Sequence, residues 1–192
     1  MAEWMTPIYA DTQALNAARD AFTKNNPRHI QLRDALRPAI WKKLWAELQH
    51  SDWQQHYLPD VFHYKTTPVP REITTFFSSQ TFCDRITQIT GKTIKHITLE
   101  LHSFEHRNYT LLHDEAKQPE ALFLFLELTT QWNPSWGGFT SFVKDEEELL
   151  RLYPVPNTLT LVHQQKNTQH FTKYVNFYAG KHRRIVLKGT CR

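Results

Sequence analysis

One histidine and two acidic residues that could bind a metal ion lie next to each other in the second half of the chain, in the segment Tyr109–Glu115. In an extended strand, residues i and i+2 point to the same side, so His113 and Glu115 would face one point while Asp114 faces away. Asp114 remains the alternative carboxylate. His170 begins another strand-like run and is the candidate for a second imidazole. Two imidazoles and one carboxylate on one side of a metal ion leave further coordination positions open, as in non-haem Fe(II) sites.

An arginine that could bind an anion lies at the start of the last strand-like run, Arg184–Gly189. A guanidinium binds a carboxylate through two parallel hydrogen bonds, which a lysine cannot reproduce. The apolar residues after Arg184 suit a buried anion-binding role. Arg183 is the alternative, because neighbours in a strand face opposite sides. The basic run Lys181–Arg184 also leaves open a nucleic-acid patch, although short basic runs are usually solvated.

The elements that must position these residues are predicted to be helices first and strands afterwards. Residues 11–24 have helical periodicity, and a second helix carries Pro38 in its first turn. A third helix is expected to start at Ser78 or Ser79 and to end at Gly91. Residues 52–71 are expected to be irregular, with aromatic side chains that could border the site and grip an extended peptide.

After Gly91 the sequence changes to short runs of β-branched and aromatic residues separated by turn residues, which predict a sandwich or jelly roll. A short acidic helix, Asp145–Leu152, is expected to interrupt the sheet. The expected strands are Thr93–Phe104, Tyr109–His113, Ala121–Thr129, Gly138–Val143, Thr158–His163, His170–Tyr178 and Arg184–Lys188.

The composition predicts one folded domain over residues 1–192, because 40% of the residues are hydrophobic and 22% are charged. The net charge of +4 permits an acidic or nucleic-acid partner without requiring one. The two cysteines, Cys83 and Cys191, exclude a disulfide scaffold and favour a reducing compartment. No signal pattern is visible at the start, and the longest apolar run, Ala121–Leu128, contains Glu127 and is too short to cross a bilayer. A soluble, cytoplasmic protein is expected.

Taken in order, these segments resemble the 2-oxoglutarate- and Fe(II)-dependent oxygenase superfamily, in its prolyl 4-hydroxylase-like branch, and within it the ribosomal-protein prolyl hydroxylases. The similarity runs from about Arg28 to the C-terminus. The landmarks that carry it are Tyr109–Glu115, Ala121–Leu128, Trp132–Gly138, Asn157–Leu161, His170–Val175 and Arg184–Gly189.

The resemblance implies a double-stranded β-helix (jelly roll, cupin-like) over residues 92–192, with supporting helices in residues 1–91. It implies that His113, Glu115 and His170 bind Fe(II). Arg184 would bind the distal carboxylate of 2-oxoglutarate, and Tyr109 would contact this cosubstrate. The other implied reactant is O2, with ascorbate as an optional addition.

The implied reaction is hydroxylation of a prolyl residue in a protein or peptide. Two departures from the family pattern stand out, since Glu115 replaces the usual Asp and Val186 replaces a hydroxyl residue. They keep open a non-catalytic binding module. The basic charge balance, together with the substrates of some relatives, keeps open an oxygenase acting on nucleic acid or a small molecule. The oligomeric state is not indicated by the sequence.

Overall fold

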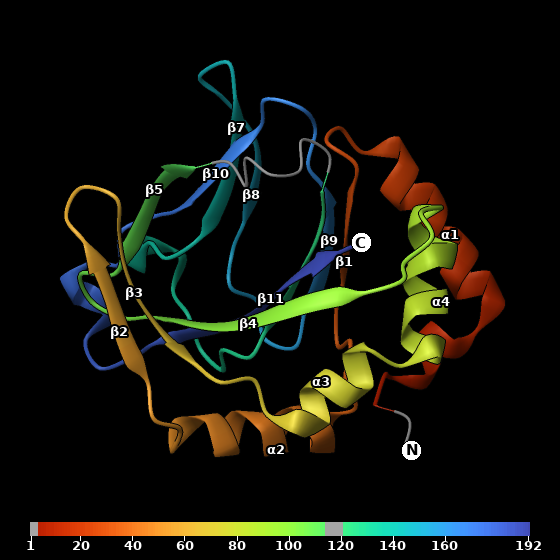
Figure 1. Ribbon diagram of the computed structural model, residues 1–192, viewed down its shortest axis with the longest axis horizontal. Coiled ribbons are helices and arrows are strands. Elements are labelled where there is room, and N and C mark those ends of the chain that lie inside the picture. Colours follow the sequence, from red (N-terminus) through yellow and green to blue (C-terminus); the bar gives the residue numbers. More distant parts are fainter. Residues whose placement is uncertain (1–3, 114–120) are drawn as a thin grey trace.

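An antiparallel sheet that curls on itself, with helices along one side, forms the framework of the computed structural model (Figure 1). The structure describes residues 4–113 and 121–192. The helices are α1 (Thr12–Lys24), α2 (Pro38–Gln49), α3 (Arg71–Phe77) and α4 (Gln80–Thr90), with short 3-10 turns η1 (Pro7–Ala10), η2 (Pro134–Trp136) and η3 (Phe177–Ala179). The strands are β1 (His29–Leu32), β2 (Gln54–Leu58), β3 (Phe62–Thr67), β4 (Ile97–Phe104), β5 (Tyr109–His113), β6 (Leu122–Glu127), β7 (Thr140–Lys144), β8 (Glu147–Leu152), β9 (Leu159–His163), β10 (Gln169–Thr172) and β11 (Arg184–Cys191).

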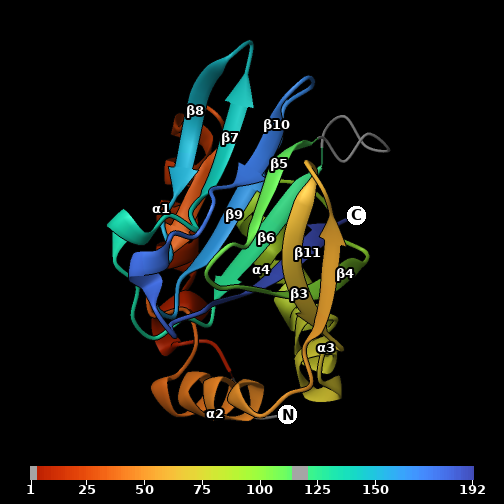
Figure 2. The ribbon, with the colours of Figure 1, turned by 90° about the vertical axis from the view of Figure 1, so that its left-hand side faces the viewer.

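The sheet has the strand order β1-β9-β6-β11-β4-β3-β5-β10-β7-β8, and β2 extends it by pairing with β3. Its curl produces two walls. Figure 2 shows β5, β10, β7 and β8 side by side as one wall. The rings of Phe125 on β6 and Phe142 on β7 are 6.1 Å apart although these strands are not neighbours in the sheet. The enclosed interior is therefore filled by side chains from both walls.

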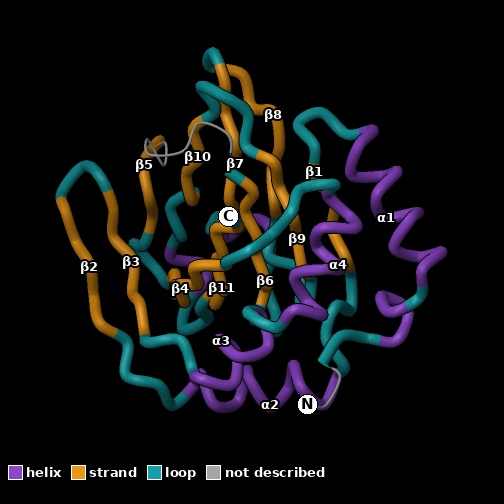
Figure 3. Tube along the Cα trace, turned by 45° about the vertical axis from the view of Figure 1, so that its right-hand side comes forward, coloured by secondary structure: helices purple, strands orange, loops and turns teal. Residues whose placement is uncertain are grey.

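Strand β6 shows why the sheet has two separate cores. Its residues alternate in direction, as expected for a strand. Leu122 and Leu124 belong to the cluster shared with the helices, whereas Phe123 and Phe125 belong to the cluster inside the curled sheet. Both faces are thus buried, which explains the continuous apolar run in the sequence. Figure 3 shows α1 and α4 to the right of the strands and α2 and α3 below them.

The three predicted helices are confirmed, and local capping explains their ends. The Asp11 side chain accepts a hydrogen bond from the Ala14 amide at 2.9 Å, which caps α1. The Ser79 side chain caps α4, and Gly91 ends it with a φ of 71°. Pro38 occupies the first turn of α2.

Two predictions about local structure are wrong. The expected acidic helix over residues 145–152 is the strand β8, which pairs with β7 through a turn at Asp145 and Glu146, both with positive φ. Pairing and the burial of Leu152 override the helical propensity of this segment. Residues 52–71, expected to be irregular, contain the β2–β3 hairpin, so the sheet also recruits strands from the N-terminal part of the chain. A single domain over the whole chain stays a prediction.

Within the described ranges, no helix has the length and apolar character that crossing a membrane requires.

Replacing Gly137 by Ala is expected to destabilise the protein by more than about 2 kcal/mol. Gly137 has a φ of 79°, and a Cβ there would overlap the Tyr174 carbonyl oxygen. The matched control is Gly91→Ala, because Gly91 has a similar φ but no atom within 4 Å of the added Cβ. That control should lose only about 1 kcal/mol. Urea unfolding of both variants measures the difference, and equal losses would contradict the predicted overlap.

Candidate metal and cosubstrate site

The structure brings His113 and His170 together at the mouth of the curled sheet. They are directly paired residues of the neighbouring antiparallel strands β5 and β10. Their ring centroids lie 4.2 Å apart, with an angle of 54° between the ring planes. The two histidines are far apart in the sequence, and the register of the sheet places their side chains next to each other, as for other cross-strand partners.

The hydrogen bonds of the two imidazoles bear on metal binding. His113 Nδ1 lies 2.8 Å from the Leu111 carbonyl oxygen, so it is the donor and Nε2 carries the lone pair. His170 is buried, and its Nδ1 has no hydrogen-bond partner. Burial, with nearby Lys188 and His113, holds the pKa of His170 well below its ordinary value. His170 is thus a neutral imidazole, the form that binds metals.

These donors fit a divalent metal ion in two respects. His170 is a neutral imidazole, the form that binds divalent metals, and a metal at its Nε2 would replace the 3.4 Å contact of that atom with Lys188 Nζ. The hydrogen bond from His113 to a backbone carbonyl is the kind that orients metal-binding histidines. Within residues 4–113 and 121–192, no three His, Cys, Asp or Glu side chains form a group that could hold a metal ion. The predicted carboxylate, Glu115 or its alternative Asp114, lies outside the described residues.

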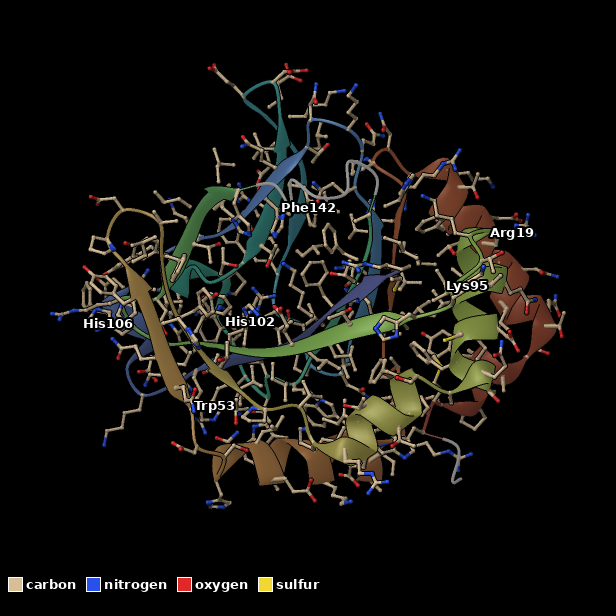
Figure 4. The ribbon with its side chains drawn as sticks, viewed as in Figure 1. Arg19, Trp53, Lys95, His102, His106 and Phe142 are labelled. Carbon is tan, nitrogen blue, oxygen red and sulfur yellow. The ribbon has the colours of Figure 1, made fainter. Side chains whose placement is uncertain are left out.

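A cavity of about 40 Å³ lies against the two histidines. Beside it lies a larger cavity of about 330 Å³, the vestibule, which shares lining residues with it. Figure 4 shows His102 and Phe142 within the space that the walls enclose. The residues lining the inner cavity are His102, Phe104, Thr110, His113, Phe125, Thr140, His170, Thr172, Val186 and Lys188.

Arg184, the predicted anion-binding residue, is fully buried and already bound to protein groups. Its Nε lies 3.0 Å and 3.2 Å from the two Glu127 carboxylate oxygens, and its Nη2 also donates to Glu127. Its Nη1 donates to the Gly138 carbonyl oxygen at 2.7 Å and to the Thr140 hydroxyl oxygen at 2.9 Å. Burial raises the pKa of the Glu127 carboxyl, and the Arg184 charge and hydrogen bonds act against this rise. The side chain of Arg184 is thus the centre of an internal network.

The neighbouring Arg183 points the other way, as strand alternation requires. Its Nη2 lies 3.0 Å from the Gln49 carbonyl oxygen at the end of α2, and its guanidinium lies over the Trp53 ring. His182 stacks on Trp136 at 4.8 Å between ring centroids. Most of the basic run Lys181–Arg184 is therefore engaged within the protein, which argues against a nucleic-acid patch there.

Tyr109 is not among the residues that line the inner cavity. It lines a separate groove of about 360 Å³ with Leu111, Phe171 and Tyr174, on another side of β5. Its predicted contact with the cosubstrate stays a prediction.

Three titratable residues of the interior, Glu127, Lys188 and His102, had no role predicted from the sequence. Glu127 had a visible signal, since a lone carboxylate in an apolar run must find a partner when buried. Lys188 has the same strand parity as Arg184, which places both on the inner face of β11. His102 on β4 pairs in register with Val186 and lies 3.0 Å from a Glu100 carboxylate oxygen.

The curled sheet with a histidine pair at its mouth defines the class: this is the double-stranded β-helix of 2-oxoglutarate/Fe(II) oxygenases. A Pseudomonas putida prolyl-4-hydroxylase matches with a TM-score of 0.71 at 15% identity, covering 93% of this chain and 98% of that one. A Trichoplax adhaerens prolyl hydroxylase, solved with a hypoxia inducible factor oxygen degradation domain peptide fragment, matches with a TM-score of 0.71 at 14% identity, covering 93% and 89%. At such identities these likenesses show the fold.

The family follows from sequence. A family described as "Oxoglutarate and iron-dependent oxygenase degradation C-term" matches residues 63–190, about two thirds of the 192 residues, and the chain belongs to this family.

Two curated relatives are similar over a shorter segment. The mouse prolyl 3-hydroxylase OGFOD1 is 41% identical over 80 residues, covering 40% of this chain and 15% of that protein. The Xenopus laevis prolyl 3-hydroxylase OGFOD1 is 38% identical over 82 residues, covering 40% of this chain and 16% of that protein. The aligned segment is thus a small part of each relative's own length.

Replacing Glu127 by Gln is expected to destabilise the protein by about 3–5 kcal/mol, because it leaves the Arg184 charge buried without a counter-ion. The control is Glu47→Gln, whose partner Lys43 is 3.6 Å away on an exposed helix face. That change should cost less than about 1 kcal/mol. Urea unfolding at neutral pH compares the two, and similar losses would show that Arg184 does not depend on Glu127.

Proposed function

We propose that this chain is a 2-oxoglutarate- and Fe(II)-dependent oxygenase that hydroxylates a prolyl residue in a protein or peptide. The observation that carries the proposal is the juxtaposition of His113 and His170, 4.2 Å apart between ring centroids. The family and the names of the two curated relatives support the reaction class.

In this proposal His113, His170 and a carboxylate from Glu115 or Asp114 hold the metal. Bound Fe(II), with 2-oxoglutarate, would supply the oxygen activation that no protein side chain provides. Ascorbate would be an accessory reductant. The protein's part is to fix the two imidazoles by strand pairing and to exclude water. Phe123 and Phe142 serve the second role, since their rings lie 5.6 Å and 5.5 Å from the His170 ring.

The surroundings of the vestibule suit an extended peptide. Val61, Phe62 and Tyr64 of the β2–β3 hairpin line it. Exposed apolar side chains, which often mark a binding surface, are found on the hairpin and on the adjoining strand β5. They are Tyr57, Leu58, Val61, Leu111 and Leu112. A protein or peptide partner follows from this surface. The two free, buried thiols fit a reducing compartment such as the cytoplasm.

A second candidate is a binding module of the same fold that does not turn over 2-oxoglutarate. The observation that favours it is the engagement of Arg184 by Glu127. For Arg184 to receive the distal carboxylate of the cosubstrate, Glu127 would have to leave, or two carboxylates would have to share one buried guanidinium. The second arrangement is opposed by like-charge repulsion.

Purified protein supplied with Fe(II) and a proline-bearing protein is expected to convert 2-oxoglutarate to succinate. His113→Ala and His170→Ala should each lower this turnover by at least about a hundredfold, because even residues that only orient metal ligands account for tens-fold effects. Succinate is measured directly, and mass spectrometry of the protein substrate should find one added oxygen on a prolyl residue.

The control is His96→Ala, which changes an exposed histidine that lies before the start of β4, outside the hairpin and the cavities, and should retain full turnover. Activity retained in both site variants would show that the ligands are other residues. Binding of 2-oxoglutarate without succinate formation would favour the binding module.

A further inference from the structure

We infer that Thr110 and the β-bulge that follows it in β5 position His113 for metal binding, with the Leu111 carbonyl group as the contact that orients the imidazole. The inference rests on the proposed function for the role of His113 as a metal ligand. It makes Thr110 a positioning residue, which acts on His113 through the backbone of β5.

Strands β5 and β10 pair out of step beside the two histidines. Thr110 is paired with Thr172, and His113 is paired with His170. Leu111 and Leu112 therefore lie opposite a single residue of β10, which is the two-to-one count of a β-bulge. Both leucine side chains are exposed, whereas neighbours in a regular strand face opposite sides. The exposure of two successive side chains agrees with the bulge.

The bulge turns His113 into the interior. Tyr109 and Leu111 line the outer groove, whereas Thr110 lines the inner cavity. Strict alternation would place position 113 on the outer side, with Tyr109 and Leu111. His113 instead lines the inner cavity and the vestibule. The extra residue of β5 thus accounts for the meeting of His113 with His170.

The Thr110 hydroxyl group holds the bulge in place. Its oxygen accepts a hydrogen bond from the backbone amide of Thr172 at 2.8 Å. In a regular antiparallel pair such an amide donates to a backbone carbonyl, so the hydroxyl replaces a ladder hydrogen bond where the pairing is disrupted. Thr172 is buried, and a buried amide without an acceptor would cost free energy. A hydroxyl residue at position 110 therefore favours the bulged register.

The Leu111 peptide group connects the β2–β3 hairpin to His113. Its N–H donates to the Val61 carbonyl oxygen at 2.8 Å, which continues the pairing of β3 with β5. A regular continuation would also have the Val61 N–H donate to the Leu111 carbonyl oxygen. The Val61 N–H instead donates to the Leu58 carbonyl oxygen at 3.1 Å, inside the hairpin turn. The Leu111 carbonyl oxygen can thus accept from His113 Nδ1, which lies 2.8 Å away.

This last hydrogen bond decides which ring nitrogen of His113 can bind a metal ion. With the proton on Nδ1 and donated to the carbonyl, the lone pair is on Nε2. Contacts of this kind fix both the tautomer and the orientation of metal-binding histidines. Loosening the bulge is therefore expected to weaken metal binding although every ligand is still present.

The test is a calorimetric titration of the metal-free protein with Mn(II). Thr110→Val keeps the β-branched shape and removes the hydroxyl, so it is expected to weaken Mn(II) binding by roughly tenfold. Thr110→Ser restores the hydroxyl and should restore the affinity. Nitrogen NMR of the metal-free protein gives a second readout: His113 should be protonated at Nδ1 in the unmodified protein and in Thr110→Ser, and should become a mixture of tautomers in Thr110→Val.

The matched control is Thr172→Val, which removes a hydroxyl from the same cavity but keeps the amide that donates to Thr110. It should change neither the Mn(II) affinity nor the tautomer. Equal losses in the two Val variants would show that the polarity of the cavity matters rather than the bulge, and would overturn the inference. So would an unchanged Mn(II) affinity in Thr110→Val, or an unmodified protein that does not bind Mn(II). If Thr110→Val fails to fold, the tautomer in the unmodified protein decides, because a His113 protonated at Nε2 contradicts the inference.

The outcome is separable from that of the proposed function. Mn(II) binding that depends on the Thr110 hydroxyl, without succinate formation, would support this inference while the oxygenase proposal fails. Succinate formation by the unmodified protein, with an Mn(II) affinity that Thr110→Val leaves unchanged, would overturn this inference while the oxygenase proposal stands.

Discussion

A buried guanidinium needs acceptors for its donors, and Arg184 finds them on two separate segments of the chain. Glu127 comes from β6, Gly138 from the turn that leads into β7, and Thr140 from the start of β7 itself. The interaction therefore joins the wall formed by β11 and β6 to the wall that contains β7. An ion pair of this kind contributes little net stability over apolar packing, but breaking it is costly. Its effect is to fix the separation of the two walls, and with it the size of the cavity beside the histidines.

The alternation of residues along β11 links this framework to the chemistry. Ile185 and Leu187 face the helices and belong to the apolar cluster that the sheet shares with them. The other face carries Arg184, Val186 and Lys188, and it points into the curled sheet. The inner face of β11 thus carries the buried guanidinium of Arg184 and also the ammonium of Lys188, which lies beside the candidate metal ligand His170. Register pairing with β4 then adds His102 next to Val186.

Much of the fold could be predicted from the sequence because its signals are local. The Asp11 and Ser79 caps mark the starts of two helices, and the apolar run at β6 reports a strand that is buried on both faces. The pairing of His113 with His170 followed from the order of the motifs. Strand β8 could not be predicted, because its acidic, leucine-rich segment becomes a strand only by pairing with β7. The partner of Arg184 was equally inaccessible, since no local pattern shows which distant carboxylate meets a buried guanidinium.

The position of Arg184 and its ability to bind a ligand have different causes. The register of β11 between β4 and β6 places position 184 on the inner face whether or not its side chain binds a ligand. Whether it can do so depends on the acceptors already present, and Glu127 supplies an internal one in this chain. Proteins that share a fold can therefore differ in chemistry when the residues around one position differ. Lys188 lies four residues further along the same face, where it lines the cavity beside His170. The inner face of β11 thus carries two cations, of which Arg184 is held by Glu127 and Lys188 borders the cavity beside the histidines.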